Sequence, residues 1–455
     1  MAKRIIVVGA GFSGVALVCQ LLRQAQVPLD ITVFEQRECH ALGIAYGTTE
    51  TVHLLNVPAA GMSMYPDQAD HFVQWLQAGG YEQQIDLDGR TLPEAFVPRY
   101  IYGRYLQDNF AKSIAAAQGK HAVHIVHEQV VALDTDDSGV RVSLACGGLH
   151  SADACVLAFG NGQPHDLLQR YQLPASRYIA NGWASQALDQ LAPDAKVLII
   201  GNGLTTVDII LSLLARGFNG AITAVSRRGL SPLAHRYGLA KINYDAATLP
   251  SRLRDVVRFM REQAANAADW RMAVDALRPH TQRLWAGLSD WEKSQFLRHP
   301  SAVWGIHRHR IAPHIAAKLA GLTESGRLLQ LSGRIESVSE AANGLSVALR
   351  KRSDNSLVTV SADMIINCTG PSTHYTRQAA PLIQDLLARG YLTPTAICDG
   401  VYMDAQSRLL NHAHQPLAHV YGMGILTRYR DWENIAVPDI RQQAAELAKT
   451  LNSTD

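Results

Sequence analysis

Apolar and polar positions near the start of the chain predict two strands joined by a helix. Residues 4–8 and 30–34 are short apolar runs typical of buried strands, and residues 12–25 carry apolar side chains at helical spacing. The order strand, helix, strand is typical of a parallel β-α-β unit. The same order recurs later, with strands predicted at 196–200 and 221–225 and a helix that begins at Leu204. The chain therefore predicts two α/β domains of the same type.

Two further strand patterns lie on either side of the second unit. Residues 151–164 and 361–374 each combine an apolar strand with a following glycine, as expected where a chain leaves one domain and later returns to it. We therefore expect an α/β fold with two Rossmann-like dinucleotide-binding domains, the second inserted in the first. The expected limits are residues 1–195 and 366–455 for the first domain and residues 196–365 for the second. Within the second domain, residues 229–320 are rich in Trp and Arg and predict a helical insertion.

The turn after the first strand has three glycines at the spacing of a dinucleotide-phosphate site. Gly9 permits a tight turn, Gly11 lets the backbone approach a pyrophosphate, and Gly14 lets the helix pack closely on the sheet. Glu35 ends the second strand, where a carboxylate can accept hydrogen bonds from an adenosine ribose. The cofactor contacts expected here are Gly9, Gly11, Phe12, Ser13, Gly14, Glu35 and Gln36. A glycine-rich turn without a nucleotide is the alternative.

Residues 42–58 do not continue the pattern with another crossover helix. The segment is punctuated by glycine and carries amide and imidazole side chains, which suits a wall for the isoalloxazine ring of FAD. We expect Leu55 and Asn56 to contact the flavin. The candidate catalytic residues, which would orient the flavin or the substrate, are His53, Asn56 and Tyr46, although a structural role for Tyr46 is an equal alternative.

The second glycine turn departs from the first at two points. Thr206 stands where the third glycine is expected, and the strand after the helix ends in Ser-Arg-Arg at residues 226–228 instead of an acid. A guanidinium group pairs well with a ribose 2′-phosphate, so this end favours NADPH over NADH. The contacts expected here are Gly201, Gly203, Leu204, Thr205, Ser226, Arg227 and Arg228. Two solvated arginines at the end of a strand are the alternative.

Further contacts are expected from the crossover strands, the C-terminal segment and the insertion. The remaining cofactor contacts are Val130, Gly160, Thr369, Gly370, Gly422 and Gly424. Gly422 and Gly424 precede the last predicted helix, so they could serve the flavin or only the docking of that helix. The expected substrate contacts are Arg298, His299, His307 and Arg308. Their positive charge suits an anionic substrate or the nucleotide phosphates, and a packed helical subdomain with snorkelling arginines is the alternative.

Composition and charge argue against several classes of protein. The chain has 455 residues and a formal net charge of +2, which gives no overall reason to bind nucleic acid or an anionic membrane. The first strand leaves no room for a signal peptide, and no apolar run reaches the roughly 18 residues that cross a bilayer, so we expect a cytoplasmic protein. The six cysteines form no C-x-x-C pair and the eighteen histidines show no metal-binding spacing, so neither a dithiol site nor a metal site is expected.

Several longer segments carry a resemblance to a known group of proteins. They are GIAYGTTETVHLLNVPAAGMSMYPDQADHFVQWL, FVPRYIYGRYL, SRRGLSPLAH, FLRHPSAVWGIHRHR and WENIAVPDIR. Over nearly its whole length the chain resembles bacterial FAD/NAD(P)-binding proteins allied to class B flavin monooxygenases, which share their fold with ornithine and lysine N-hydroxylases and include a FAD-dependent urate hydroxylase. The resemblance implies FAD at the first glycine turn and flavin contacts from residues 53–56. The chain lacks the F-x-G-x-x-x-H-x-x-x-W/Y signature, which argues against Baeyer–Villiger and microsomal-type chemistry.

These observations predict a reaction class. We expect an FAD-dependent, NADPH-using monooxygenase in which a hydroperoxyflavin hydroxylates a small polar or anionic substrate, either a urate-like heterocycle or an amine. The expected partners are that substrate and dioxygen. An NADPH-dependent flavin oxidoreductase that inserts no oxygen and a non-catalytic, nucleotide-binding redox sensor are the alternatives.

Overall fold

A computed structural model describes residues 2–397 and 400–453 of the chain. The chain divides into two units, each with its own core. The first unit comprises Met1–Gly162, Thr281–Gly287 and Thr373–Asp455, and the second comprises Gln163–His280 and Leu288–Ser372. Among the described residues, no helix has both the length and the apolar character needed to span a membrane.

The first unit is built on a six-stranded sheet with the order β15-β16-β7-β1-β2-β3. All neighbouring strands are parallel except the edge pair β15 and β16. The strands are β1 (Lys3–Val8), β2 (Leu29–Phe34), β3 (Ala122–Val126), β7 (Ala154–Leu157), β15 (Arg408–Leu410) and β16 (Pro416–Gly422). The buried strands β1 and β7 are nearly continuous apolar runs, as expected for a parallel sheet covered on both faces. The predicted strand, helix, strand order at the start of the chain is therefore confirmed.

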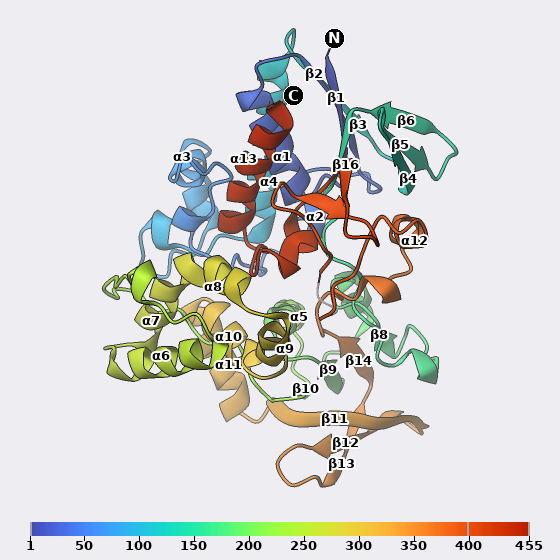
Figure 1. Cartoon of the computed structure of the whole chain (residues 1–455). Helices are drawn as coiled ribbons and strands as arrows, with labels where there is room; N and C mark the ends of the chain where they lie inside the picture. The colour runs from blue at the N-terminus through green and yellow to red at the C-terminus, as the bar shows by residue number, and fades with distance from the viewer. Residues whose placement is uncertain (1, 398–399, 454–455) are drawn as a thin grey trace. The chain divides into compact units, whose positions relative to one another are not determined.

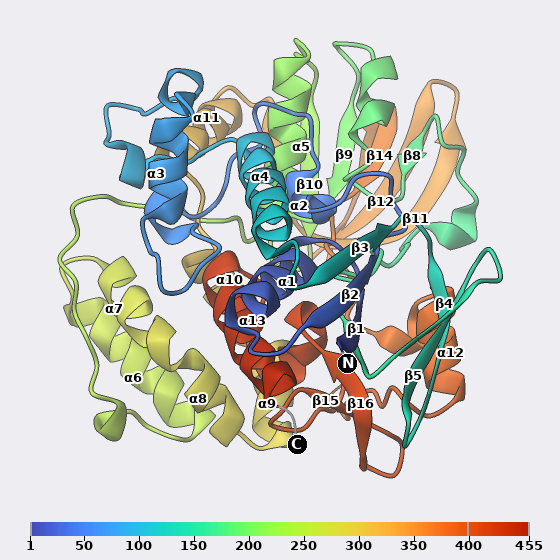
Figure 2. The same cartoon turned by 90° about the horizontal axis from the view of Figure 1, so that it is seen from above.

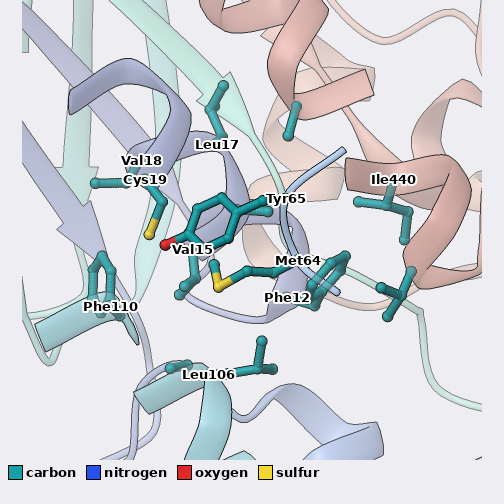
Figure 3. Packing of buried hydrophobic residues seen from close by; sticks show 14 of the residues in the cluster. Phe12, Val15, Leu17, Val18, Cys19, Met64, Tyr65, Leu106, Phe110 and Ile440 are labelled. Atoms are coloured by element: carbon teal, nitrogen blue, oxygen red, sulfur yellow. The ribbon is translucent and has the colours of Figure 1, made fainter. Parts of the chain in front are cut away.

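Three long helices of the first unit pack together beside this sheet. They are α1 (Phe12–Gln24), α4 (Arg99–Ala117) and α13 (Val437–Asn452), and α1 lies next to α13 although they are at opposite ends of the sequence (Figures 1 and 2). Figure 3 shows part of the resulting core, with Phe12, Val15 and Cys19 of α1, Met64 and Tyr65 of a loop, Phe110 of α4 and Ile440 of α13. The first turn of α1 is consequently fixed by packing on several sides.

Smaller elements complete the first unit. An antiparallel sheet of β4 (Val130–Asp136), β5 (Gly139–Leu144) and β6 (Leu149–Ala152) packs through β4 on α12 (Pro381–Ala388), as Figure 2 shows. The remaining α-helices among the described residues of this unit are α2 (Gly43–Tyr46), α3 (His71–Ala78) and α8 (Thr281–Gly287). Helix α8 belongs to this unit although its sequence neighbours belong to the second unit. Its Trp285 is buried and stacks on Trp432 with ring centroids 4.5 Å apart.

The second unit is built on a seven-stranded sheet with the order β13-β12-β11-β10-β9-β14-β8. The strands are β8 (Tyr178–Ile179), β9 (Val197–Ile200), β10 (Ile222–Ser226), β11 (Leu328–Ala341), β12 (Gly344–Lys351), β13 (Leu357–Ala362) and β14 (Met364–Asn367). Strand β11 pairs in parallel with β10 at its start and then antiparallel with β12. Helix α5 (Leu204–Ala215) connects β9 to β10, as predicted from the second repeat of the pattern.

The segment between β10 and β11 is largely helical, which confirms the predicted insertion. It contributes α6 (Leu253–Asn266), α7 (Trp270–Leu277), α9 (Asp290–Arg298), α10 (Ser301–Arg308) and α11 (Pro313–Glu324) to the second unit. Helix α9 begins with a capping box in which Ser289 and Glu292 satisfy each other's backbone amides.

Candidate cofactor sites

The first glycine turn is held between the ends of two strands. The Gly9 amide donates to the Phe34 carbonyl at 2.8 Å, and Gly9 has a φ of +106°, which favours glycine. A Cβ at Gly9 would lie 2.5 Å from the carbonyl oxygen of Ala158. The turn therefore requires glycine both for its backbone angle and for its approach to the chain after β7.

The helix that follows the turn presents its N-terminus without a side-chain cap. Within the described residues no side chain caps α1 at Gly11 and no acid lies in its first turn. A Cβ at Gly14 would lie 2.0 Å from the Gly9 carbonyl, so helix and turn touch through bare backbone. The first amides of a helix lack partners inside the helix and attract anions. The amides of Phe12 and Ser13 thus open α1 without a side-chain cap, and their role in binding a phosphate stays a prediction.

Glu35 lies at the end of β2 beside the turn. Its side chain is only 4% exposed and accepts a hydrogen bond from the Ala10 amide at 3.1 Å. The Arg37 guanidinium donates to both carboxylate oxygens, at 3.0 and 3.2 Å. The Arg37 amide also donates to Oε1 at 3.2 Å, so all four lone-pair positions of the carboxylate are used, and a ribose hydroxyl would have to replace one of the Arg37 donors. Gln36 is exposed. Arg37 was not predicted from the sequence, although a basic residue two positions after Glu35 could have indicated an ion pair with it.

In the predicted flavin wall, Arg99 donates hydrogen bonds to the backbone of residues 53 and 54, and the side chains of His53 and Arg99 are buried. The Arg99 amide donates to the His53 carbonyl at 2.8 Å, and the Arg99 side chain donates to the Leu54 carbonyl at 2.9 Å. His53 is 3% exposed and its Nδ1 lies 2.9 Å from the Thr48 hydroxyl. Leu55 is buried and Asn56 is half-buried. Arg99, buried at the start of α4, was not among the residues predicted from sequence.

Tyr46 is brought to the start of α1 by the short helix α2. Its ring centroid lies 6.5 Å from that of Phe12 and 4.7 Å from that of Tyr102. Burial raises the pKa of Tyr46 to about 12, and the nearby Arg99 opposes this rise. The Tyr46 hydroxyl is therefore protonated at neutral pH and available as a hydrogen-bond donor.

The C-terminal segment also reaches the first turn. A Cβ at Gly424 would lie 2.8 Å from the Ser13 hydroxyl oxygen, so this glycine lies beside the start of α1. The Gly424 amide donates to the Gln443 side chain at 2.8 Å, and the Thr427 hydroxyl donates to the Gly424 carbonyl at 2.9 Å. Gly422 ends β16 next to β7. Among the other predicted contacts of this unit, Val130 begins β4 and Gly160 adopts a φ of +74° after β7.

The second glycine turn repeats the geometry of the first. The Gly201 amide donates to the Val225 carbonyl at 2.8 Å, its φ is +117°, and a Cβ there would lie 2.3 Å from the Cys368 carbonyl oxygen. Helix α5 begins after Gly203, again with no side-chain cap within the described residues, and its first residues are Leu204 and Thr205. Thr206 is 1% exposed, so this helix buries a side chain where α1 has Gly14.

The other predicted contacts of the second unit fall into two groups. Thr369 donates through its amide and hydroxyl to the Asn367 side chain at 3.1 and 2.8 Å, and Gly370 follows with a φ of +83°. Residues 226–228 follow β10, with Arg227 exposed and Arg228 half-buried. These positions flank the second turn in the manner that Glu35 and Gly160 flank the first.

The predicted substrate residues lie on two consecutive helices of the second unit. Arg298 and His299 are exposed at the end of α9. His307 packs on Trp270 with ring centroids 4.6 Å apart, and its Nδ1 lies 2.8 Å from the Val303 carbonyl oxygen. Arg308 is buried. The side chains thus have different surroundings, and their role in binding a substrate stays a prediction.

The described cysteines are all free thiols, and Cys398 lies outside the described residues. Within the described part of the chain, no group of three or more His, Cys, Asp or Glu side chains is arranged to hold a metal ion.

Comparison with known proteins agrees with this geometry. Residues 6–162 match a protein family described as FAD-NAD(P)-binding. An uncharacterized protein of Escherichia coli, YdhS, is 25% identical over 217 residues, which are 46% of this chain and 39% of that protein. An L-aspartate N-monooxygenase of Streptomyces davaonensis is 26% identical over 264 residues, 49% of this chain and 40% of that enzyme. The matches to these relatives thus span less than half of their length.

A solved structure extends the likeness to the whole chain. The ornithine hydroxylase of Pseudomonas aeruginosa in its reduced form superposes with a TM-score of 0.66, covers 99% of both chains and is 17% identical. A likeness at this identity shows the fold, and it confirms the predicted α/β architecture with two dinucleotide-binding folds. The family match and the first glycine turn fall in the same segment, residues 6–162, which is therefore similar to FAD-NAD(P)-binding proteins.

Proposed function

We propose that the chain is an FAD- and NADPH-dependent monooxygenase that hydroxylates the nitrogen of a small amine. The observation that carries this proposal is the duplicated turn. Gly9 and Gly201 each combine a positive φ, a 2.8 Å hydrogen bond to the end of the next strand and close packing on a third strand end. Two phosphate sites of one design imply two dinucleotides in one protein.

The first unit fits FAD. The uncapped start of α1 would hold the pyrophosphate, and Glu35 would accept from the ribose. Gly11 offers no side chain above the turn, and the nearest atom to its missing Cβ is the Gly43 Cα at 3.5 Å. The segment with His53, Leu55 and Asn56 and the Gly424 backbone would line the ribityl chain and the ring. The FAD domain would be this unit, Met1–Gly162, Thr281–Gly287 and Thr373–Asp455, in place of the predicted residues 1–195 and 366–455.

The second unit fits NADPH. The amides of Leu204 and Thr205 would meet the pyrophosphate, and no atom of this unit lies within 4 Å of a Cβ built at Gly203. The strand end at residues 226–228 carries arginines where the first unit has an acid, which favours a 2′-phosphate. The NADPH domain would be this unit, Gln163–His280 and Leu288–Ser372, in place of the predicted residues 196–365.

The reaction class is supported by the relatives. The Streptomyces davaonensis relative is named as an enzyme that oxidises the nitrogen of L-aspartate, and the Pseudomonas aeruginosa structure is an ornithine hydroxylase. When bound, NADPH supplies the electrons and FAD supplies the activation of dioxygen. The chain's own residues would bind the cofactors and exclude water, and Tyr46 would hold a proton at its hydroxyl, because burial raises its pKa to about 12.

The test is a coupled turnover assay on the purified protein supplied with FAD. Oxidation of NADPH, uptake of oxygen, formation of a hydroxylamine and release of peroxide are measured together with L-aspartate, L-ornithine, L-lysine, simple diamines and urate. We expect one amine to raise NADPH oxidation and to yield hydroxylamine in a matching amount. Hydroxylation of urate would assign a heterocycle as the substrate. Reduction of an added acceptor without oxygen uptake would replace the proposal by a flavin oxidoreductase, and failure of NADPH to reduce the flavin would leave a nucleotide sensor.

A further inference from the structure

The two glycine turns identify equivalent positions at the ends of the neighbouring strands. Gly9 bonds to the carbonyl of Phe34 and Gly201 bonds to that of Val225, so Glu35 and Ser226 occupy the same place in the two units. The Glu35 carboxylate would repel a 2′-phosphate, whereas the Ser226 hydroxyl carries no charge and accepts the Gly229 amide at 3.0 Å. The second unit therefore lacks the group that excludes NADPH.

The same register makes Arg228 the equivalent of Arg37. Arg37 pairs with Glu35, but Arg228 has no acid at position 226 to meet. Its guanidinium instead donates to the carbonyls of Arg298 and His299, the latter at 2.5 Å, at the end of α9. The last carbonyls of a helix lack internal partners and carry partial negative charge, so a cation there is stabilised. The Arg228 guanidinium thus holds this loop against the end of α9.

Two other guanidinium groups lie at this strand end. The Arg227 side chain is exposed and forms no hydrogen bond within the described residues. The Arg352 guanidinium lies 3.4 Å from the Arg227 carbonyl oxygen, and the Arg352 amide donates to the Ser332 carbonyl at 2.9 Å. Ser332 is the register partner of Ser226 on the adjacent strand β11. Among the described residues, no acidic side chain forms an ion pair with Arg227 or Arg352.

We propose that Arg227 and Arg352 bind the 2′-phosphate of NADPH, and that Arg228 is a positioning residue that fixes their loop against α9. Arg352 is distant in sequence from the glycine turn, and β12, paired with β11, delivers it to the end of β10. Two uncompensated guanidinium groups suit a phosphomonoester, which accepts several charge-assisted hydrogen bonds. This inference rests on the proposed function only in naming NADPH as the ligand.

The experiment measures binding instead of turnover. Purified full-length protein with its flavin is titrated calorimetrically with 2′,5′-ADP and with 5′-AMP, which differ only in the 2′-phosphate. We expect tighter binding of 2′,5′-ADP. Arg227→Ala and Arg352→Ala should each weaken that binding about tenfold or more, the effect of a lost charge-assisted hydrogen bond, and leave 5′-AMP unchanged. Arg258→Ala, which removes an exposed arginine from α6 of the same unit, is the matched control and should change neither affinity.

Arg228→Gln tests whether Arg228 positions the loop or binds the phosphate itself. Glutamine keeps a donor for the α9 carbonyls and removes the charge, so the preference for 2′,5′-ADP should persist while thermal stability falls. The proposal is overturned if Arg228→Gln abolishes the preference, or if neither Arg227→Ala nor Arg352→Ala reduces it. Loss of the preference in these two variants together with no hydroxylamine in the turnover assay would sink the proposed function and keep this inference. Hydroxylation driven equally by NADH and NADPH would overturn this inference and keep the proposed N-hydroxylation.

Discussion

Among the described glycines of the first unit, Gly14 is the one where an added Cβ would come closest to a neighbouring atom, and a single methyl group tests this contact. A Cβ at Gly14 would be 2.0 Å from the Gly9 carbonyl oxygen and 3.1 Å from its carbon, and Cβ contacts under 3.0 Å are essentially never seen. Gly14→Ala therefore requires helix and turn to separate by about 1 Å. Side chains from Val15 to Leu21 are buried along α1, so the helix has little freedom to move.

The magnitude follows from two opposing contributions. Forcing an extra methyl into a packed site costs about 1–3 kcal/mol, and contact with backbone instead of a flexible side chain places this site at the upper end. Alanine favours the helical conformation by about 1 kcal/mol relative to glycine. We expect Gly14→Ala to lower the free energy of unfolding by about 2 kcal/mol and to widen the turn, with loss of bound FAD.

The assay follows unfolding in denaturant by circular dichroism, and the FAD content of the purified protein is measured separately. Gly321→Ala is the matched control, because Gly321 lies inside α11 and a Cβ there meets no atom within 4 Å. That variant should become more stable by up to about 1 kcal/mol. If Gly14→Ala keeps its flavin and its stability, the turn is not held by the contact that we describe.

Three further predictions concern other parts of the first unit. Glu35→Gln should weaken FAD binding about tenfold through the loss of a charge-assisted hydrogen bond; titration of deflavinated protein with FAD measures this, and an unchanged Kd would argue against a ribose contact. Trp285→Ala removes a buried ring that stacks on Trp432 and should lower the free energy of unfolding by about 3–5 kcal/mol, measured by chemical denaturation; an unaffected midpoint would show that α8 contributes little. Burial raises the pKa of the Cys19 thiol to about 11, because the charged thiolate is disfavoured in the core. The free energy of unfolding should therefore fall as the pH rises from the ordinary thiol pKa through about 11. Alkylation at neutral pH, mapped by mass spectrometry, should label exposed Cys39 and spare Cys19, and early labelling of Cys19 would contradict its burial.

Local sequence patterns sufficed for the parts of the fold that depend on local physics. Strand, turn and helix follow one another at both glycine turns within one or two residues of the expected limits, because apolar runs and glycines act over short distances. The need for glycine at positions 9 and 201 could also be predicted from the sequence pattern, and each of these residues adopts a positive φ. Thr206, which stands where the third glycine of the second turn is expected, is buried in α5.

The rest depends on contacts between distant residues, which no local pattern records. The partners of Arg228 are backbone carbonyls some 70 residues away, and backbone carbonyls have no sequence signature. Gly424 lies beside Ser13 across nearly the whole chain, and α8 joins the first unit from within a segment of the second. The guanidinium of Arg310 likewise pairs with Asp275 of α7, which lies 35 residues earlier in the chain.

The two turns share one geometry, so differences in how each nucleotide is held must come from what surrounds them in each unit. At the first turn, Gly43 lies 3.5 Å from the missing Cβ of Gly11, and Gly424 lies beside Ser13, so segments distant in sequence border the site. Within the second unit no atom comes within 4 Å of the corresponding position at Gly203. A nucleotide bordered by several packed segments leaves only when they move, whereas one held at an open helix start and by exposed arginines can exchange. This difference fits a resident FAD and a visiting NADPH, the division of labour that a flavin monooxygenase requires.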